Sequence, residues 1–169
     1  RSLYIMRLIR SGERLAAGDA VRVTTSDQTQ GLGTFTADGH ALLFASNKEP
    51  AVYRSPRLFR VELRLGPDGA VVGGGPVSRM CDAFGSGPRA SADGKSILFV
   101  RGYAGLERPR YRGSGNTDIY AFDAAAKTFT RLTDELGTDT DPWGLPDGSV
   151  VFISSRDGQN NVWRMTPPA

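Results

Sequence analysis

The densest group of side chains suited to ligand binding lies in the stretch RGYAGLERPRYRGSGN, residues 101–116. Four arginines and two tyrosines are interspersed there with glycine and proline, a composition typical of a loop. A guanidinium group binds a carboxylate through two parallel hydrogen bonds, and a tyrosine ring adds apolar contact. Arg110, Tyr111 and Arg112 are therefore candidates for binding a peptide carboxylate or the acidic face of a partner protein.

The same loop has a simpler explanation in the composition of the chain. Arginine outnumbers lysine by 18 to 3 along the whole sequence, so an arginine-rich loop needs no ligand. The formal net charge is only +3, whereas a nucleic-acid interface requires basic residues gathered on one face. We therefore expect a peptide or protein ligand, if any, and no nucleic acid.

An acidic stretch, DELGTDTDP at residues 134–142, offers several carboxylates close together. Oxygen ligands suit calcium, but the order Asp-x-Asp-x-Asp-Gly of a calcium loop is absent. Asx turns leading into a strand account for Asp139 and Asp141. We expect no metal and no cofactor, and we keep Asp141, with Trp143 two residues later, as a candidate contact for substrate.

The sequence contains few of the residues that nucleophilic catalysis requires. His40 is the single histidine and adjoins an Asp-Gly turn, where a solvated side chain is expected, and a Ser-His-Asp or Cys-His site would need that one residue. Cys81 is the single cysteine, which excludes an internal disulfide and the usual zinc spacings. We expect no catalytic residue in this chain, and we expect Cys81 to be a half-buried apolar side chain.

The elements that must hold these residues repeat along the chain. Asp38-Gly39, Asp93-Gly94 and Asp147-Gly148 follow one another at intervals of 55 and 54 residues, and each precedes an apolar run typical of a buried strand. Further strands are expected at 57–62, 118–123 and 161–165, with another at 2–7. A fourth strand is expected at 21–25, 76–80 and 130–134, and VVGGGPV at 71–77 is interpreted as a hairpin or bulge in such an outer strand.

A repeat of this length with four strands is typical of a β-propeller blade. Helical periodicity is sustained nowhere, so the predicted fold class is all-β. We expect a propeller fragment of about three to four four-stranded antiparallel blades from a six- or seven-bladed ring, with the remaining blades on the same polypeptide. The predicted divisions are 1–33 (end of one blade), 34–87 (second blade), 88–140 (third blade) and 141–169 (start of a fourth).

The stretches SADGKSILFV, DIYAFDAAAKTFTRLTD and GTDTDPWGLPDGSVVFISSRDGQNNVWRM resemble the TolB-like subset of WD-like propeller repeats. The resemblance covers nearly the whole chain. This sequence departs from the repeat pattern at Leu145, where Ser is usual before Pro-Asp-Gly, and at Ala37 and Ala92, which replace the Pro. The resemblance implies a binding propeller.

Residues 99–165 are also similar to the N-terminal propeller of tricorn-type serine peptidases, in which a long loop ending YRGSGN precedes DIY, RLTD and DTDPWG. That similarity implies a non-catalytic segment that gates or guides peptides towards a catalytic domain outside this chain. The alternative is a TolB-like interaction propeller of the bacterial envelope without enzymatic activity. A third reading is a propeller ahead of a prolyl-oligopeptidase-type hydrolase domain.

The chain contains no run of 18 apolar residues, so we expect no membrane insertion. The resemblance implies a periplasmic or secreted protein, while the composition leaves a cytoplasmic location open. In isolation, the chain should be marginally stable or self-associating, because the terminal units of a repeat array lack neighbours.

Overall fold

A computed structural model describes residues 2–25, 30–47 and 55–167. For Gln30 and Leu32 it describes the backbone only. The described residues form strands and turns, and no helix long and apolar enough to cross a membrane occurs among them. The strands are β1 (Tyr4–Ser11), β2 (Arg14–Arg22), β3 (Gln30–Phe35), β4 (Ala41–Ser46), β5 (Arg57–Leu65), β6 (Val71–Phe84), β7 (Ser86–Ala90), β8 (Ser96–Arg101), β9 (Asp118–Asp123), β10 (Thr128–Arg131), β11 (Asp139–Gly144), β12 (Val150–Ser154) and β13 (Asn161–Met165).

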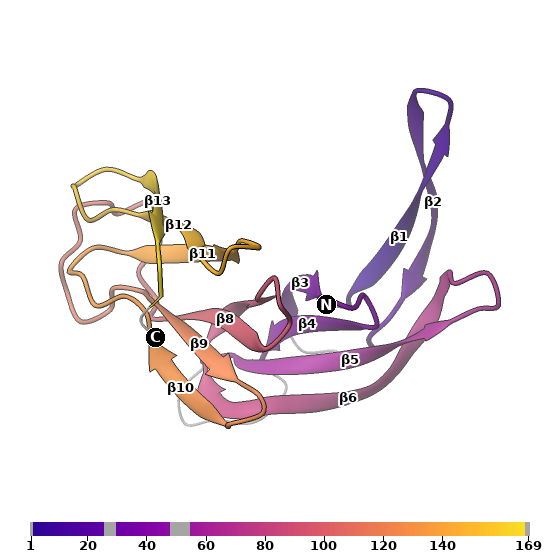
Figure 1. Cartoon of the computed structure of the whole chain (residues 1–169), viewed down its shortest axis with the longest axis horizontal. Coiled ribbons are helices and arrows are strands. Elements are labelled where there is room, and N and C mark those ends of the chain that lie inside the picture. The colour runs from indigo at the N-terminus through magenta and orange to yellow at the C-terminus, as the bar shows by residue number, and fades with distance from the viewer. Residues whose placement is uncertain (1, 26–29, 48–54, 168–169) are drawn as a thin grey trace.

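These strands form four antiparallel sheets, which succeed one another along the chain (Figure 1). Two sheets have four strands, in the orders β3-β4-β5-β6 and β7-β8-β9-β10, the first sheet is the hairpin β1-β2, and the last is β11-β12-β13. Every sheet therefore joins strands that are consecutive in sequence, as in the blades of a propeller. The predicted all-β class with repeated antiparallel sheets of about four strands is confirmed.

Strand positions agree closely with the apolar pattern in the second and third strand of each unit. Strands β9 and β13 occupy the predicted ranges 118–123 and 161–165, and β4, β8 and β12 contain the predicted apolar runs. The outer strands differ more, because β6 is 14 residues long and includes the whole of VVGGGPV. Its pairing with β5 shifts register three times, which confirms a bulged outer strand at this stretch.

Among the described residues, the core lies between successive sheets in three clusters. The first joins Val23, Phe44 and Phe59 to Ile5 of β1 and to Leu3 just before that strand. The second brings Leu58 against Phe99 and Phe122 across two sheets. The third unites the last two sheets and contains Val100, Ile119, Phe152, Leu132, Trp163 and Met165. Each four-stranded sheet is thus covered on both faces, which explains why its second strand is apolar without alternation.

The sheets converge at their first strands and diverge at their last. Strand β7 contacts both β3 and β11, which are first strands of their own sheets. Between β6 and β9–β10, by contrast, lies a hollow of about 340 Å³, whose lining includes Cys81, Phe122 and Phe129. Cys81 is half-buried against the second cluster, as predicted, and burial raises the pKa of its thiol. The first strands β3, β7 and β11 are therefore the inner strands, on the side of the propeller axis.

The Asp-Gly turns join the inner strands to the second strands by one repeated set of hydrogen bonds. The Oδ1 atoms of Asp38, Asp93 and Asp147 accept the backbone N–H two residues later, and Gly39, Gly94 and Gly148 have φ of 72°, 71° and 82°. In the first two turns, a hydroxyl at Thr36 or Ser91 also donates to the aspartate. The third turn has Leu145 at this position, and the Ser149 hydroxyl donates to Asp147 instead, at 2.6 Å. His40 is exposed in the first turn, as predicted for a solvated turn histidine.

Candidate functional site

The five candidate residues from the sequence occupy two separate places. Arg110, Tyr111 and Arg112 lie in the long loop between β8 and β9, whereas Asp141 and Trp143 lie on the inner strand β11. Among the described residues, no hydrogen bond, ion pair or ring contact joins the two groups. The loop and the inner strand are therefore two candidate contact regions and not one assembled site.

The loop is ordered by its tyrosines and glycines. The Arg108 guanidinium lies 4.5 Å from the centre of the Tyr111 ring, and the Tyr111 hydroxyl accepts a hydrogen bond from Gly115 N at 3.1 Å. A hydrogen bond with the side chain of Tyr111 raises the pKa of Tyr103. A Cβ atom on Gly113 would lie 2.3 Å from the Tyr111 hydroxyl, so the YRGSGN sequence lets the ring fold back onto its own loop.

Hydrogen bonds also join the loop to the next sheet, and Arg112 donates one of them. Its guanidinium donates to Ser155 O at 3.0 Å, beside the β12–β13 turn, and to two carbonyl oxygens of its own loop. Asn160 supports the same junction by donating to Leu106 O at 2.7 Å. Arg112 therefore positions the loop, while Arg110 is exposed at a shallow hollow of about 580 Å³ and has no hydrogen-bond or ion-pair partner among the described residues.

Each inner strand is interrupted by a bulge, which controls where its side chains point. In β7 the pairing shifts between Ser86 and Arg89, and in β11 it shifts between Thr140 and Trp143. Gly87 (φ 57°) and Asp141 (φ 50°) occupy the same place in the two bulges, and each is followed by a fully buried proline. A positive φ is uncommon for a residue other than glycine and costs about 1–2 kcal/mol, so Asp141 is held in a strained, exposed position beside the axis.

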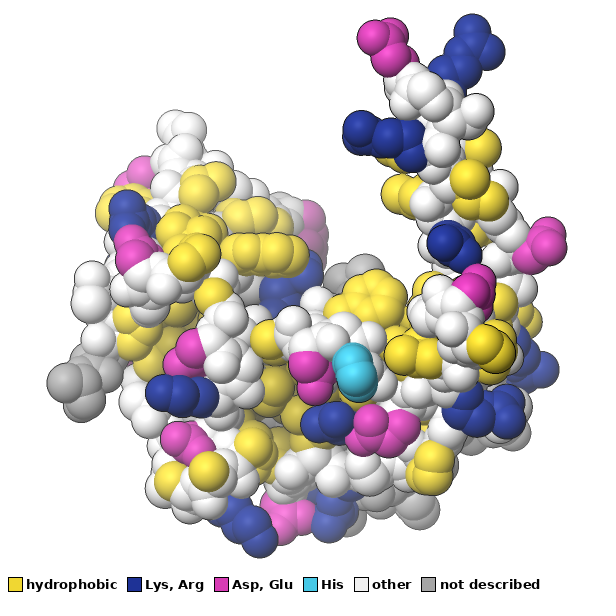
Figure 2. Space-filling model, turned by 45° about the vertical axis from the view of Figure 1, so that its right-hand side comes forward, with side chains coloured by type: hydrophobic (Ala, Val, Ile, Leu, Met, Phe, Trp, Pro, Cys, Tyr) yellow, Lys and Arg dark blue, Asp and Glu magenta, His cyan; other side chains and the backbone are white. Residues whose placement is uncertain are grey.

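The bulges bring Arg89 and Trp143 together across two neighbouring inner strands. Arg89 pairs with Leu98 and Trp143 pairs with Val151, which are equivalent register positions of their sheets. The Arg89 guanidinium lies 4.9 Å from the centre of the Trp143 ring, and Trp143 is 55% exposed. Figure 2 shows hydrophobic side chains bordering the hollow between the last sheet and the projecting β1–β2 hairpin.

Arg89 was not among the residues singled out from the sequence. The signal was present in the alignment of GPRA, residues 87–90, with DPWG, residues 141–144, when both are counted back from their Asp-Gly turns. That alignment places Arg89 and Trp143 at one repeat position. It does not reveal that the two side chains touch, because their contact depends on the distance between adjacent sheets.

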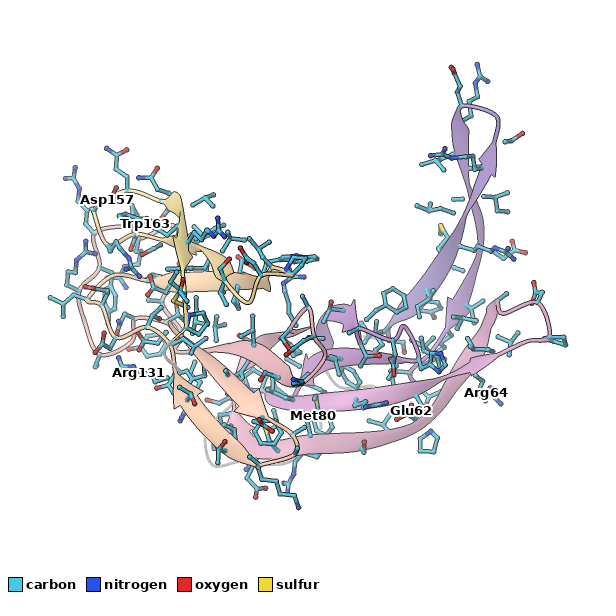
Figure 3. The ribbon with its side chains drawn as sticks, in the orientation of Figure 1. Glu62, Arg64, Met80, Arg131, Asp157 and Trp163 are labelled. Atoms are coloured by element: carbon cyan, nitrogen blue, oxygen red, sulfur yellow. The ribbon has the colours of Figure 1, made fainter. Side chains whose placement is uncertain are left out.

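A buried ion pair supports the strand that carries Asp141 and Trp143. Asp139 is fully buried, and its Oδ2 accepts a hydrogen bond from Arg156 at 3.1 Å, so the Asx-turn interpretation of Asp139 is wrong. Arg156 also stacks between Phe152 and Trp163, at 5.1 Å from each ring centre. In Figure 3, Trp163 and Asp157 mark this end of the last sheet. Arg156 thus fixes the start of β11 from the β12–β13 turn.

A second aspartate, in the preceding sheet, also forms an ion pair with an arginine. Asp118 Oδ2 accepts a hydrogen bond from Arg131 at 2.8 Å. Burial raises the pKa of the Asp118 carboxyl, and the charge of Arg131 opposes that change. Across the described ranges, no three His, Cys, Asp or Glu side chains lie close enough together to hold a metal ion.

Comparison with known structures places this arrangement within one fold. No family model matches the chain. Putative TolB from Agrobacterium tumefaciens matches with a TM-score of 0.64 and 22% identity over 95% of this chain, and TolB from Acinetobacter baumannii matches with 0.60 and 23% over 89%. The chain is a β-propeller segment.

Tricorn protease shares the same fold more distantly, with a TM-score of 0.56 and 15% identity over 98% of this chain. The segment therefore resembles both TolB and tricorn propellers. The structural matches do not favour the tricorn propeller over the TolB propeller. The segment spans 54% and 33% of the two TolB chains and 20% of the tricorn protease chain. At these identities the comparison concerns the fold alone.

Proposed function

We propose that this propeller segment binds extended peptides beside the propeller axis and guides them, as the non-catalytic gate of a tricorn-type serine peptidase whose catalytic domain lies outside these residues. The observation that carries the proposal is the contact between Arg89 and Trp143 on neighbouring inner strands, with Trp143 55% exposed. Exposed tryptophan and arginine side chains are the residue types that contribute most to binding energy at protein surfaces. Their position on inner strands would bring a bound chain close to the axis.

The free edges of the inner strands support the same proposal. Strands β3, β7 and β11 each lie at the end of a sheet, so each pairs with one strand only among the described residues. Such an edge offers backbone N–H and C=O groups to an extended chain. The buried prolines Pro88 and Pro142 remove one N–H each, and the bulges interrupt the edge. We therefore expect side-chain contacts, and not a continuous added strand, to dominate peptide binding.

Peptide binding by the full-length protein tests this function. Fluorescence anisotropy with a labelled pool of short peptides should give weaker binding, by about tenfold, after Trp143→Ala, because an exposed aromatic anchor typically contributes more than 1 kcal/mol. The matched control is Val162→Ala, which truncates a side chain 77% exposed on the edge strand β13. Equal affinity of the Trp143 variant and the unchanged protein would contradict the proposal.

The arginine loop requires a different pair of variants. Arg110→Gln removes a charge that has no partner among the described residues, whereas Arg112→Gln also breaks the tie to Ser155 and would disturb the loop. Arg110→Gln should lower affinity for peptides with free carboxylates if Arg110, Tyr111 and Arg112 contact substrate. Arg10→Gln, on the β1–β2 hairpin, is the control for a lost surface charge.

A TolB-like interaction module is the second candidate function. Its support is the higher TM-scores of the two TolB structures, 0.64 and 0.60 against 0.56. Such a module binds a folded protein partner through the same inner-strand surface and performs no chemistry. Absence of any peptide binding at millimolar concentration, in the assay described above, would contradict the peptidase gate and favour this candidate.

A further inference from the structure

Arg89 has no acidic partner among the described residues, in contrast to three other arginines of the last two sheets. Arg131 pairs with Asp118, Arg156 pairs with Asp139, and Arg164 pairs with Asp147. Within the described ranges, Arg89 contacts the Trp143 ring and forms neither an ion pair nor a hydrogen bond through its side chain. Asp141 lies two residues before Trp143. Its carboxylate is exposed and forms no ion pair with Arg89.

The N–H groups of Arg89 remain available, because its guanidinium lies over the Trp143 ring and donates no hydrogen bond among the described residues. A guanidinium contacts an aromatic ring through its flat face, whereas its five N–H groups point outward in its own plane. A carboxylate can therefore bind the edge while the face stays on Trp143. Arg89 is half-buried, and partial removal of water strengthens its attraction for a negative charge.

Trp143 contributes an apolar surface beside this edge. It remains 55% exposed although Arg89 lies on it, so part of the ring is open to a second group. The close approach of β11 to residues 91 and 92 keeps the two side chains together, since a Cβ on Gly144 would lie 3.3 Å from Ala92 N. An acidic group and an apolar group on one ligand would then be bound side by side.

We propose that Arg89 and Trp143 form a subsite for an acidic side chain with an apolar neighbour in the bound peptide, so that the segment selects acidic-apolar sequences. This inference rests on the proposed function, because it names the ligand chemistry of the same inner-strand surface. The carboxylate binds the Arg89 edge through two hydrogen bonds, and the apolar side chain packs on Trp143.

Two labelled peptides with blocked ends test the subsite on the full-length protein. One carries glutamate next to phenylalanine, and the other has glutamine in place of the glutamate, so neither has a terminal carboxylate. The glutamate peptide should bind about tenfold more tightly, which is the lower end of the range for a hydrogen bond to a charged group. This preference should shrink at high salt, because part of it is the attraction of opposite charges.

Variants assign the preference to its residues. Arg89→Gln should remove the preference for glutamate, and Arg89→Lys should retain only part of it, because lysine keeps the charge and loses the planar pair of donors. Trp143→Ala should weaken both peptides. Arg10→Gln is the control for net charge and should leave the preference unchanged.

The outcomes separate this inference from the function on which it rests. Binding of both peptides with equal affinity would overturn the acidic subsite and leave peptide binding intact. A preference for glutamate that survives Arg89→Gln would overturn the assignment to Arg89. If neither peptide binds the unchanged protein, both the subsite and the peptide-binding function are overturned.

Discussion

At the scale of single residues, Asp139 and Arg156 show how much the inner strand depends on one buried charge pair. The Asp139 side chain is 0% exposed and that of Arg156 is 23% exposed, whereas both partners of the Arg164–Asp147 pair are more than half exposed. Removal of one partner from a buried pair leaves the other charge without compensation. An exposed pair has water available to both partners.

We therefore expect Arg156→Ala to lower the free energy of unfolding by about 3 kcal/mol or more, because the Asp139 carboxyl would remain buried without its partner. Arg164→Ala, at the exposed pair with Asp147, should cost about 1 kcal/mol or less. Urea denaturation followed by tryptophan fluorescence measures both variants. Similar losses in the two variants would mean that the buried pair contributes no more than a surface one.

Arg112 illustrates a residue whose role the sequence does not reveal. Its residue type and its position in an arginine-rich loop predict a ligand contact, and that prediction stays open. The structure adds a positioning role, because its acceptor Ser155 O lies 43 residues further along the chain. No local pattern identifies a backbone carbonyl at that distance as a hydrogen-bond partner.

At the scale of elements, the Asp-Gly turn is the repeated unit that joins the first two strands of the three sheets that follow the β1–β2 hairpin. The pKa of Asp93 is lowered first by the hydrogen bond from the Ser91 hydroxyl and then by the backbone N–H of Lys95. Asp38 and Asp147 also have lowered pKa values, with the hydroxyls of Thr36 and Ser149 as the first causes. Each turn therefore favours a charged aspartate.

This arrangement predicts a direction for the pH dependence. A carboxyl whose pKa is lower in the folded protein stabilises it above the ordinary value of 3.8, and this contribution is lost as the pH falls through the lower folded-state pKa. Ser91→Ala should move the pKa of Asp93 upward, towards 3.8, and make the loss of stability in acid shallower. A carbon-detected NMR titration of the carboxyl measures the shift, and Ser114→Ala, in the exposed part of the arginine loop, is the control. An unchanged Asp93 titration would contradict the role of the hydroxyl.

At the scale of the whole molecule, the sheets at the two ends of the series are the least covered. The β1–β2 hairpin projects from the body, and its exposed apolar side chains include Leu8 at 66% and Leu15 at 60%. Strand β13 pairs only with β12, so its other edge has no strand beside it among the described residues. Exposed apolar patches and open strand edges favour association with other chains.

The 169-residue chain should therefore self-associate as its concentration rises, and sedimentation velocity measures this. Leu8→Lys should reduce the association, because a charge on the hairpin opposes apolar contact between chains. Leu136→Lys is the matched control, since Leu136 is 70% exposed but lies in the connection between β10 and β11. A single monomeric species at every concentration would overturn this prediction.

The sequence by itself determined the Asp-Gly turns of this propeller segment and the second and third strands of its units. The Asp-Gly pairs, the apolar runs after them and the 54- to 55-residue spacing are local signals, because a turn residue with positive φ or a buried strand is encoded within a few positions. They yielded the all-β class and the antiparallel pairing of consecutive strands.

Only the tertiary structure decided which side chains meet between sheets. Arg89 with Trp143, Arg112 with Ser155 O, and Phe99 with Leu58 each join residues of neighbouring sheets. These contacts depend on how closely the sheets pack and on bulges that redirect the inner strands, and neither is encoded in the residues next to them. The repeat therefore predicts the parts of each sheet, whereas the packing between repeats creates the candidate binding surface.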